Sequence, residues 1–257
     1  MRKVHVLPVG HEMGDKGGIT LLKDIGKTIE IPYHSYLIED PEANILVDTS
    51  SSVRWKELHP VALSKFWPVH MKVSERPNRV LERIGFSPDD IDYVVNTHLH
   101  YDHCGNNALF PKATFLVQED ELLHASSPSW WEAFPYVKKV FDVAGLKYKS
   151  LKGDFQVVPG VTAIQTPGHT EGHQSVVVEL ERSGVVVLAG DAIYVRENLE
   201  DPILPGLYVD ARMYAESMQR IKDIVKKRNG TLLLSHSREY LSPKGWKKLR
   251  PGVSTFD

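Results

Sequence analysis

The sequence predicts an α/β (α+β) sandwich contained in one domain. Segments rich in β-branched residues, typical of strands, recur in both halves of the chain, and segments with helical signals lie between them. The 257 residues show no internal repeat, low-complexity tract or linker-like boundary. This order favours the mixed class over a helical bundle or an all-β fold. Residues 1–257 are therefore expected to form a single domain.

The first part of the chain carries mainly strand signals. Strands are predicted at residues 3–9, 34–40, 44–50 and 91–97. The turn EDPEAN at 39–44 predicts a hairpin between the second and third strands. Residues 50–74 are irregular in pattern and rich in aromatic side chains. A helix is predicted at 76–85, where Gly85 ends it.

The second part alternates strand and helix signals. Strands are predicted at residues 113–118, 155–158, 161–166, 174–181, 184–191 and, as the final strand, 231–236. The turn ERSG at 181–184 predicts a hairpin, and 126–150 form a second aromatic segment. Helices are predicted at 119–125 and 210–228, the second capped by Asp210. Apolar residues spaced by four, three and four mark one face of that helix: Tyr214, Met218, Ile221 and Val225.

Composition excludes several classes of protein. With 31 basic and 33 acidic residues, the net charge of −2 leaves no electrostatic footprint for nucleic acid. No stretch approaches the roughly 20 apolar residues of a membrane span, and the N-terminal apolar run is too short for a signal peptide. Cys104 is the single cysteine and suits a reducing compartment. We expect a cytoplasmic monomer or homodimer with neither a nucleic-acid nor a membrane partner.

The segment HLHYDH at 98–103 is the strongest functional signal. His98 and His100 alternate, so both can lie on one side of an extended segment, while Asp102 and His103 follow as the chain turns toward a helix at Gly105. Histidine and carboxylate at this spacing suit zinc and similar metals. Because the two halves of the cluster point in different directions, the pattern suits two adjacent metals better than one.

Three later segments add side chains of the same kind at strand ends. His169 follows a strand and a Pro-Gly turn, Asp191 ends an apolar strand, and His236 ends another. Their positions imply that these ends converge on one edge of a sheet. We expect one metal site built from His98, His100, Asp102, His103, His169, Asp191 and His236.

These residues, in this order, resemble the metallo-β-lactamase superfamily. The resemblance spans most of the chain and implies a four-layer αββα sandwich with metals between its two sheets. It implies that His98, His100 and His169 hold one zinc ion. It implies that Asp102, His103 and His236 hold another, with Asp191 bridging the two.

A closer resemblance is to the quorum-quenching N-acyl homoserine lactonases. Four stretches carry it: NTHLHYDHCGNN, GDFQVVPGV, TPGHTEGHQS and GDAIYVRENLED. The last places Tyr194 three residues after Asp191, where a tyrosine of that family contacts the substrate. Two departures are present, because Ser50 stands where the superfamily usually has glycine and Ser237 where these lactonases commonly have aspartate.

The implied activity is opening of an acyl-substituted lactone by a hydroxide that bridges two divalent metal ions. Zinc is the first expectation, with cobalt, manganese and iron as open alternatives. We expect Tyr194 to stabilise the developing oxyanion and Asp102 to pass a proton to the leaving alkoxide. A half-buried structural tyrosine is the alternative for Tyr194.

Several neighbouring residues have two interpretations. Asp48 either supports a metal-binding histidine or caps a turn. His173 is interpreted as structural or supporting rather than a ligand, and Cys104 as a small residue packed at a helix start. Five side chains are hypothetical contributors to an acyl-binding wall, with core packing or a dimer contact as the alternative: Trp55, Phe66, Trp67, Met71 and Tyr101.

Competing functions differ in their sequence requirements. A thioesterase resembling glyoxalase II, or a lactonase for another ring, would use the same ligands, and Tyr194 with the stretch GDAIYVRENLED favours a lactone over a thioester. A nucleic-acid processing relative would need an added domain and a basic groove. A binding module without catalysis would be expected to lack ligands, and class B β-lactamases lack a carboxylate at the position of Asp191.

Overall fold

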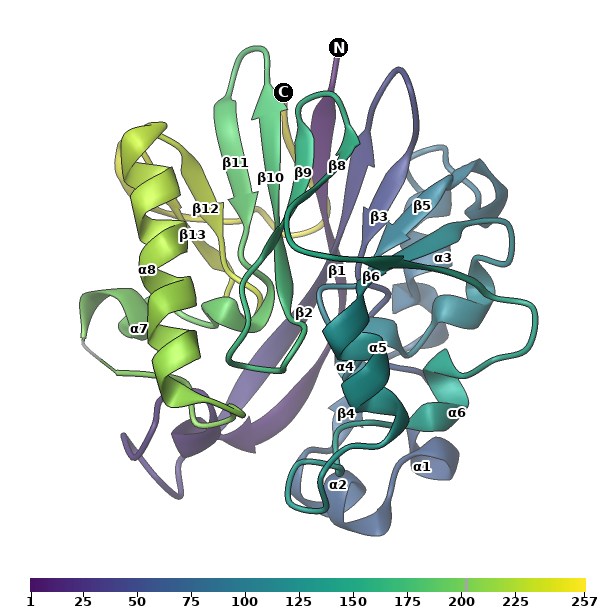
Figure 1. Ribbon diagram of the computed structural model, residues 1–257, viewed down its shortest axis with the longest axis vertical. Helices are drawn as coiled ribbons and strands as arrows, with labels where there is room; N and C mark the ends of the chain where they lie inside the picture. The colour runs from purple at the N-terminus through teal and green to yellow at the C-terminus, as the bar shows by residue number, and fades with distance from the viewer. Residues whose placement is uncertain (202) are drawn as a thin grey trace.

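The computed structural model describes residues 1–201 and 203–257 and has four layers. Two β-sheets pack face to face, and helices cover the outer face of each sheet (Figure 1). The predicted αββα sandwich is therefore confirmed. The two chain termini lie at the same end of the sandwich (Figure 1).

The first sheet contains most of the N-terminal half. Its strands are β1 (Lys3–Asp15), β2 (Thr28–Glu39), β3 (Ile45–Val47), β4 (Val69–His70), β5 (Tyr93–Val95), β6 (Thr114–Gln118), β7 (Lys147–Leu151) and β15 (Ser254–Phe256). Their order is β15-β1-β2-β3-β5-β6-β7, and β4 pairs with β1. The predicted hairpin is confirmed, because β2 and β3 pair antiparallel from Ile38 and Ile45.

The second sheet comes from the C-terminal half. Its strands are β8 (Phe155–Val158), β9 (Val161–Gln165), β10 (Gln174–Leu180), β11 (Gly184–Leu188), β12 (Thr231–Leu233), β13 (Glu239–Ser242) and β14 (Gly245–Lys248). Their order is β14-β13-β12-β11-β10-β9-β8. The second predicted hairpin is also confirmed by the antiparallel pairing of β10 with β11.

The helices are short, apart from one. They are α1 (Trp55–Leu58), α2 (Val61–Phe66), α3 (Pro77–Glu82), α4 (Tyr101–Cys104), α5 (Glu119–Ser126), α6 (Lys138–Phe141), α7 (Glu197–Glu200) and α8 (Ala211–Lys227). Of these, α8 lies against the second sheet, and α3 to α6 lie on the side of the first (Figure 1). In the described part of the chain, none has the length and apolar character needed to cross a membrane.

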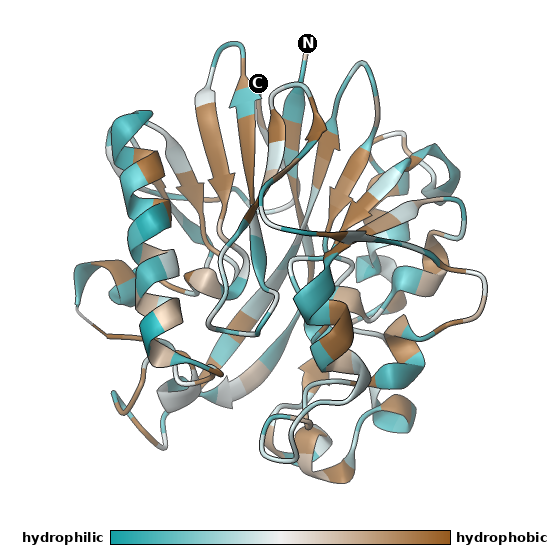
Figure 2. Cartoon of the chain, viewed as in Figure 1, coloured by the Kyte–Doolittle hydropathy of each residue, from teal (hydrophilic) through white to brown (hydrophobic). Residues whose placement is uncertain are grey.

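Strand alternation distributes the core among the layers. In β5, Val95 points between the sheets while Val94 points to the helices outside. In β11, Val186 packs between the sheets and Val187 against α8. Figure 2 shows hydrophobic residues concentrated along these strands. Because successive side chains alternate, buried strands supply two cores at once and read as continuous apolar runs.

Helix α8 matches its predicted pattern. The Asp210 side chain accepts a hydrogen bond from the Met213 N–H at 2.8 Å, so the predicted cap is confirmed. All four residues of the predicted apolar face are buried: Tyr214, Met218, Ile221 and Val225. Their burial fixes α8 against the second sheet.

Other expectations were wrong. The segment 50–74 is not irregular, since it forms α1, α2 and β4. Residues 231–236 do not form the final strand, because β13 and β14 extend the second sheet and β15 the first. The helix expected at Gly105 instead begins at Tyr101, which places Asp102 and His103 on α4.

Replacing Ile221 tests the packing of α8. Ile221 is fully buried, so Ile221→Ala should lower the free energy of unfolding by about 2–5 kcal/mol through lost burial and a residual cavity. The exposed neighbour provides a matched control, and Lys222→Ala should change it by less than about 0.5 kcal/mol. Urea unfolding followed by circular dichroism measures both; similar losses in the two variants would contradict this packing.

Candidate metal centre

All seven predicted metal-binding side chains follow the C-terminal ends of strands. β5 leads to His98 and His100 and then to α4 with Asp102 and His103, β9 leads to His169, β11 to Asp191, and β12 to His236. Strands β9, β11 and β12 run in the same direction, and β5 faces them from the first sheet. The ends meet at the end of the sandwich away from the chain termini (Figure 1).

Three histidines form the first group. The Nε2 atom of His169 lies 3.2 Å from Nε2 of His98 and 3.1 Å from Nδ1 of His100. All three side chains are buried, and their atoms are close enough to bind one ion. Burial lowers the pKa values of His98 and His100 well below the usual value. These imidazoles are therefore neutral, which is the form that binds metal.

Two histidines and two aspartates form the second group. The Asp191 Oδ1 atom lies 3.1 Å from His103 Nε2 and 3.2 Å from His236 Nε2. Asp102 Oδ2 lies 3.4 Å from the same atom of His103. The four side chains could hold a second ion. Compared with the first group, they offer one histidine fewer and two carboxylates in addition.

Asp191 lies between the two groups. While its Oδ1 atom faces the second group, its Oδ2 atom lies 3.4 Å from Nε2 of His169 in the first. Burial alone would raise the pKa of Asp191, but His103 and His236 hold it well below the usual value. The carboxylate is ionised and presents one oxygen to each group.

The polar atoms at the centre fit divalent cations. His103 Nε2 and Asp191 Oδ1 are buried and lack hydrogen-bond partners among the described residues, although they lie 3.1 Å apart. Burial alone would lower the pKa of His103, yet nearby carboxylates, Asp191 foremost, raise it well above the usual value. A cation would replace the imidazolium proton and satisfy both atoms. The donor set therefore fits divalent metal ions, as expected from sequence.

Hydrogen bonds behind the rings orient them. Asp48 Oδ2 accepts from His103 Nδ1 at 2.7 Å, in agreement with the supporting role considered for Asp48. The Nδ1 atoms of His236 and His169 lie 3.1 Å and 2.9 Å from the carbonyl oxygens of Pro32 and Leu207. Each contact places the proton on Nδ1 and leaves Nε2 free for a metal ion.

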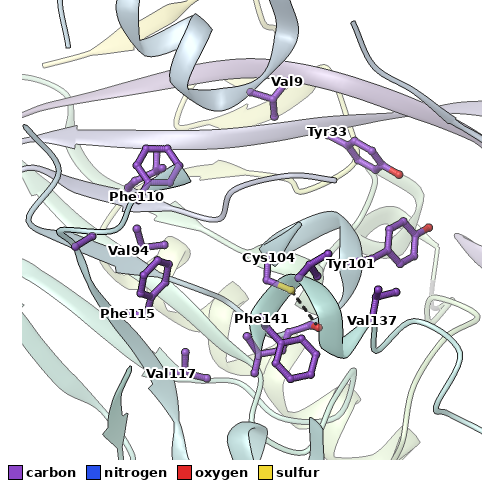
Figure 3. Packing of buried hydrophobic residues seen from close by; sticks show 14 of the residues in the cluster. Val9, Tyr33, Val94, Tyr101, Cys104, Phe110, Phe115, Val117, Val137 and Phe141 are labelled. Atoms are coloured by element: carbon purple, nitrogen blue, oxygen red, sulfur yellow. Dashed lines mark hydrogen bonds between the residues drawn. The ribbon is translucent and has the colours of Figure 1, made fainter. Parts of the chain in front are cut away.

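His173 and Cys104 lie outside both ligand groups. His173 Nε2 accepts the backbone N–H of Asp191 at 2.9 Å, so this ring holds the chain that carries Asp191. The Cys104 thiol donates to the His100 carbonyl at 3.1 Å and lies among apolar side chains (Figure 3). Both agree with the supporting and packing roles expected of them.

The two sequence departures are accommodated locally. Ser50 adopts φ of +58°, the left-handed region that favours glycine, and its hydroxyl donates to the Val9 carbonyl at 2.9 Å. The Ser237 hydroxyl accepts from the Glu239 N–H, while His236 is oriented by the Pro32 carbonyl. Both substitutions leave the predicted ligands in place.

A pocket opens onto both groups. Its lining includes Tyr194, whose hydroxyl lies 3.2 Å from His169 Nδ1. Burial, then the charge of Asp191, raises the pKa of Tyr194 well above its usual value, so the hydroxyl keeps its proton. The remaining walls come largely from side chains distant in sequence: Glu12, Ile19, Trp67, Tyr101, Phe134, Pro135 and Leu207.

The expected acyl-binding wall is only partly present. Trp67 and Tyr101 line the pocket, whereas Trp55 and Met71 pack against the core and Phe66 is exposed. Sequence reasoning missed Glu12, Ile19 and Leu207. The available signal for Glu12 was an acidic residue three positions after the strand predicted at 3–9, and nothing local indicated which way it points.

Comparison with known proteins agrees with this geometry. Residues 29–236 match the family model of the Metallo-beta-lactamase superfamily. The chain belongs to this superfamily. It is 35% identical over 247 residues to the N-acyl homoserine lactonase AiiA of Bacillus thuringiensis subsp. kurstaki, covering 93% of this chain and 94% of AiiA. The resemblance expected from sequence is confirmed.

Other relatives support the same assignment. The N-acyl homoserine lactonase AttM of Rhizobium radiobacter is 32% identical over 239 residues, covering 88% of this chain and 87% of AttM. A solved N-acyl homoserine lactone hydrolase superposes with a TM-score of 0.82 at 34% identity, covering 91% of this chain and 92% of that one. That structure holds the product N-hexanoyl-L-homoserine at its catalytic metal center.

A buried histidine next to the pocket makes stability depend on pH. Both ring nitrogens of His59 are buried without partners among the described residues, and the ring lies 4.5 Å from that of Tyr101. Burial lowers the pKa of His59 from 6.5 to about 4. The His59 side chain is therefore protonated below about pH 6.5 in the unfolded chain, but only below about pH 4 in the folded chain. The contribution of the neutral His59 ring to the free energy of unfolding is complete above pH 6.5. Below that pH it falls by about 1.4 kcal/mol per pH unit.

His59→Phe should remove this dependence. In metal-free protein, the free energy of unfolding of the variant minus that of wild type should increase as the pH falls from about 7 to about 5. Urea unfolding at several pH values measures the difference. Parallel curves for the two proteins would show that His59 is protonated equally easily in the folded and unfolded states.

Proposed function

We propose that this protein is a dinuclear zinc hydrolase that opens the lactone ring of N-acyl homoserine lactones. The observation that carries the proposal is the position of Asp191, which presents one oxygen to each of two histidine-containing groups below an apolar-walled pocket. Similarity to lactonases over most of the chain supports the same substrate class.

The two geometric groups become two ligand sets. We assign His98, His100 and His169 to one ion and Asp102, His103 and His236 to the other, with Asp191 shared. Imidazole with carboxylate favours zinc, although cobalt, manganese and iron(II) bind similar donors. When bound, such ions supply a Lewis acid for the carbonyl and lower the pKa of water to about 7.

Tyr194 is assigned to the carbonyl oxygen of the substrate. With Nε2 of His169 turned to the ligand group, its Nδ1 proton is donated to the Leu207 carbonyl. Tyr194 therefore cannot donate its own proton to that nitrogen, 3.2 Å away. The Tyr194 proton can be donated to an oxygen in the pocket, where negative charge develops as the ring carbonyl is attacked.

Asp102 is assigned to proton transfer. Its side chain lines the pocket, and its Oδ2 atom lies 3.4 Å from His103 and 3.7 Å from His236. The departing ring oxygen needs a proton when the carbon–oxygen bond breaks. Asp102 is the carboxylate of the second group that is not shared with the first, so it can take the proton that the attacking hydroxide leaves on the new carboxyl group and pass it to the ring oxygen.

The function is tested by turnover and metal content together. Purified protein should contain about two metal ions per chain and release protons from N-acyl homoserine lactones more efficiently than from thioesters or β-lactams. Removing the ions with a chelator should abolish the reaction, and adding zinc should restore it. Two bound ions without lactone turnover would overturn the proposal, and preferred thioester turnover would indicate a glyoxalase II-like enzyme.

Tyr194→Phe isolates the role of the hydroxyl. Because a hydrogen bond to a charged oxygen contributes about 1.5–3 kcal/mol, kcat/KM should fall by about ten- to a hundredfold. Metal content should not change, since the phenol belongs to neither ligand group. Steady-state kinetics with N-hexanoyl homoserine lactone and elemental analysis measure both. Unchanged kcat/KM would show that Tyr194 has only a packing role.

A further inference from the structure

A carboxyl group outside both ligand groups lines the pocket. Glu12 on β1 is 4% exposed and borders the same cavity as Asp102 and Tyr194. Of the acidic residues in the described lining, Asp102 and Asp191 belong to the ligand groups and Glu12 does not. The chemistry assigned to the pocket so far leaves Glu12 without a role.

One oxygen of Glu12 is occupied and the other is free. The hydroxyls of Tyr33 and Tyr101 both donate to Oε2, the second at 2.5 Å. Figure 3 shows these two rings at the edge of the apolar cluster, with both hydroxyl oxygens pointing away from it. Oε1 has no hydrogen-bond partner among the described residues. The two tyrosines thus hold the carboxyl in place while leaving one oxygen available.

This arrangement is costly for the folded protein. Burial and then the charge of Asp102 raise the pKa of Glu12 from 4.5 to about 8, and the described lining contains no lysine or arginine to pair with it. An apolar residue would occupy the same strand position at lower cost. A cation bound by the Asp102 group offsets part of the negative charge and favours the carboxylate.

We propose that Glu12 is a specificity-determining residue whose free Oε1 accepts a hydrogen bond from the amide N–H of an N-acyl homoserine lactone. The inference rests on the proposed function. Such a substrate carries an N–H donor on the carbon next to the lactone carbonyl, and the rest of its acyl chain is apolar. A pocket with apolar walls and one free carboxylate oxygen near the reacting groups matches that distribution.

The consequence is discrimination between lactones with and without the amide. A site with a buried acceptor rejects an analogue that lacks the donor, because the acceptor is then left without a partner. The protein should therefore prefer N-hexanoyl homoserine lactone to an α-alkyl-γ-butyrolactone of matched chain length. The ring and the scissile bond are the same in both compounds.

Glu12→Met tests the assignment, since methionine has a similar length and no acceptor of comparable strength. It should reduce kcat/KM for the N-acyl lactone by about ten- to a hundredfold, mainly through KM, and change that for the alkyl lactone by less than about threefold. Glu39→Gln is the control, because Glu39 lies on β2 outside the pocket and pairs with Lys3. Glu39→Gln should leave kcat/KM unchanged for both lactones. Equal losses on both lactones, or no loss on either, would overturn the role of Glu12.

Glu12→Gln gives a second test that preserves shape. Its amide oxygen can still accept from Tyr33 and Tyr101, while its NH₂ group replaces the free oxygen with a donor. The N-acyl lactone should lose as much kcat/KM as with methionine; retained discrimination would overturn the acceptor assignment. Metal content of both variants should match wild type within error, and a loss of metal would instead make Glu12 a structural residue.

Calorimetry separates this inference from the proposed function. N-hexanoyl homoserine, the ring-opened compound, should bind wild type at least about tenfold more tightly than a hydroxy acid without the amide, and Glu12→Met should remove the difference. If no lactone were hydrolysed, the proposed function would fail, while this amide-dependent binding would still decide the role of Glu12. Equal binding of both compounds to wild type would overturn it.

Discussion

The site depends on the placement of one buried carboxylate between two sets of histidines. Asp191 follows β11, and its backbone is held on two sides, by the His173 ring at its N–H and by the Tyr214 hydroxyl at its carbonyl. Tyr214 comes from α8 and His173 from the segment before β10. The packing of the second sheet and its helix therefore determines where the shared carboxylate lies, and the two groups have a common centre only because of it.

The two groups differ in charge although they lie side by side. The first consists of buried imidazoles that are neutral, because burial holds the pKa values of His98 and His100 well below the usual value. The second includes carboxylates, and Asp48 adds another behind His103. Without cations, these acidic groups raise the pKa of His103 and its Nε2 atom has no hydrogen-bond partner among the described residues. Bound divalent ions would balance the charge of the carboxylates and would give the His103 Nε2 atom a partner. Such ions would make burial of so polar a cluster favourable.

The pocket above this cluster combines apolar walls with a small number of polar groups. Tyr194 and Glu12 come from opposite halves of the chain, and each has a polar group available to a molecule in the pocket. The phenol keeps a proton that it cannot donate to His169, and the carboxyl keeps an oxygen that the tyrosines do not occupy. Placed around one cavity, these groups supply a donor and an acceptor in addition to the ligands.

Local pattern in the sequence predicted four residues of the candidate metal centre, His98, His100, Asp102 and His103, and the helix α8. The ligand spacing in HLHYDH and the apolar spacing of three and four residues in α8 each involve only residues close together in the sequence. Both could therefore be predicted. Strands β13 to β15 could not, because they are short and partly exposed; β13 and β14 pair with each other and with β12, and β15 pairs with the distant β1. Glu12 lay beyond prediction because its partners Tyr33 and Tyr101 lie 21 and 89 residues away. Only tertiary packing brings these hydroxyls to one carboxyl oxygen and leaves the other without a hydrogen-bond partner among the described residues.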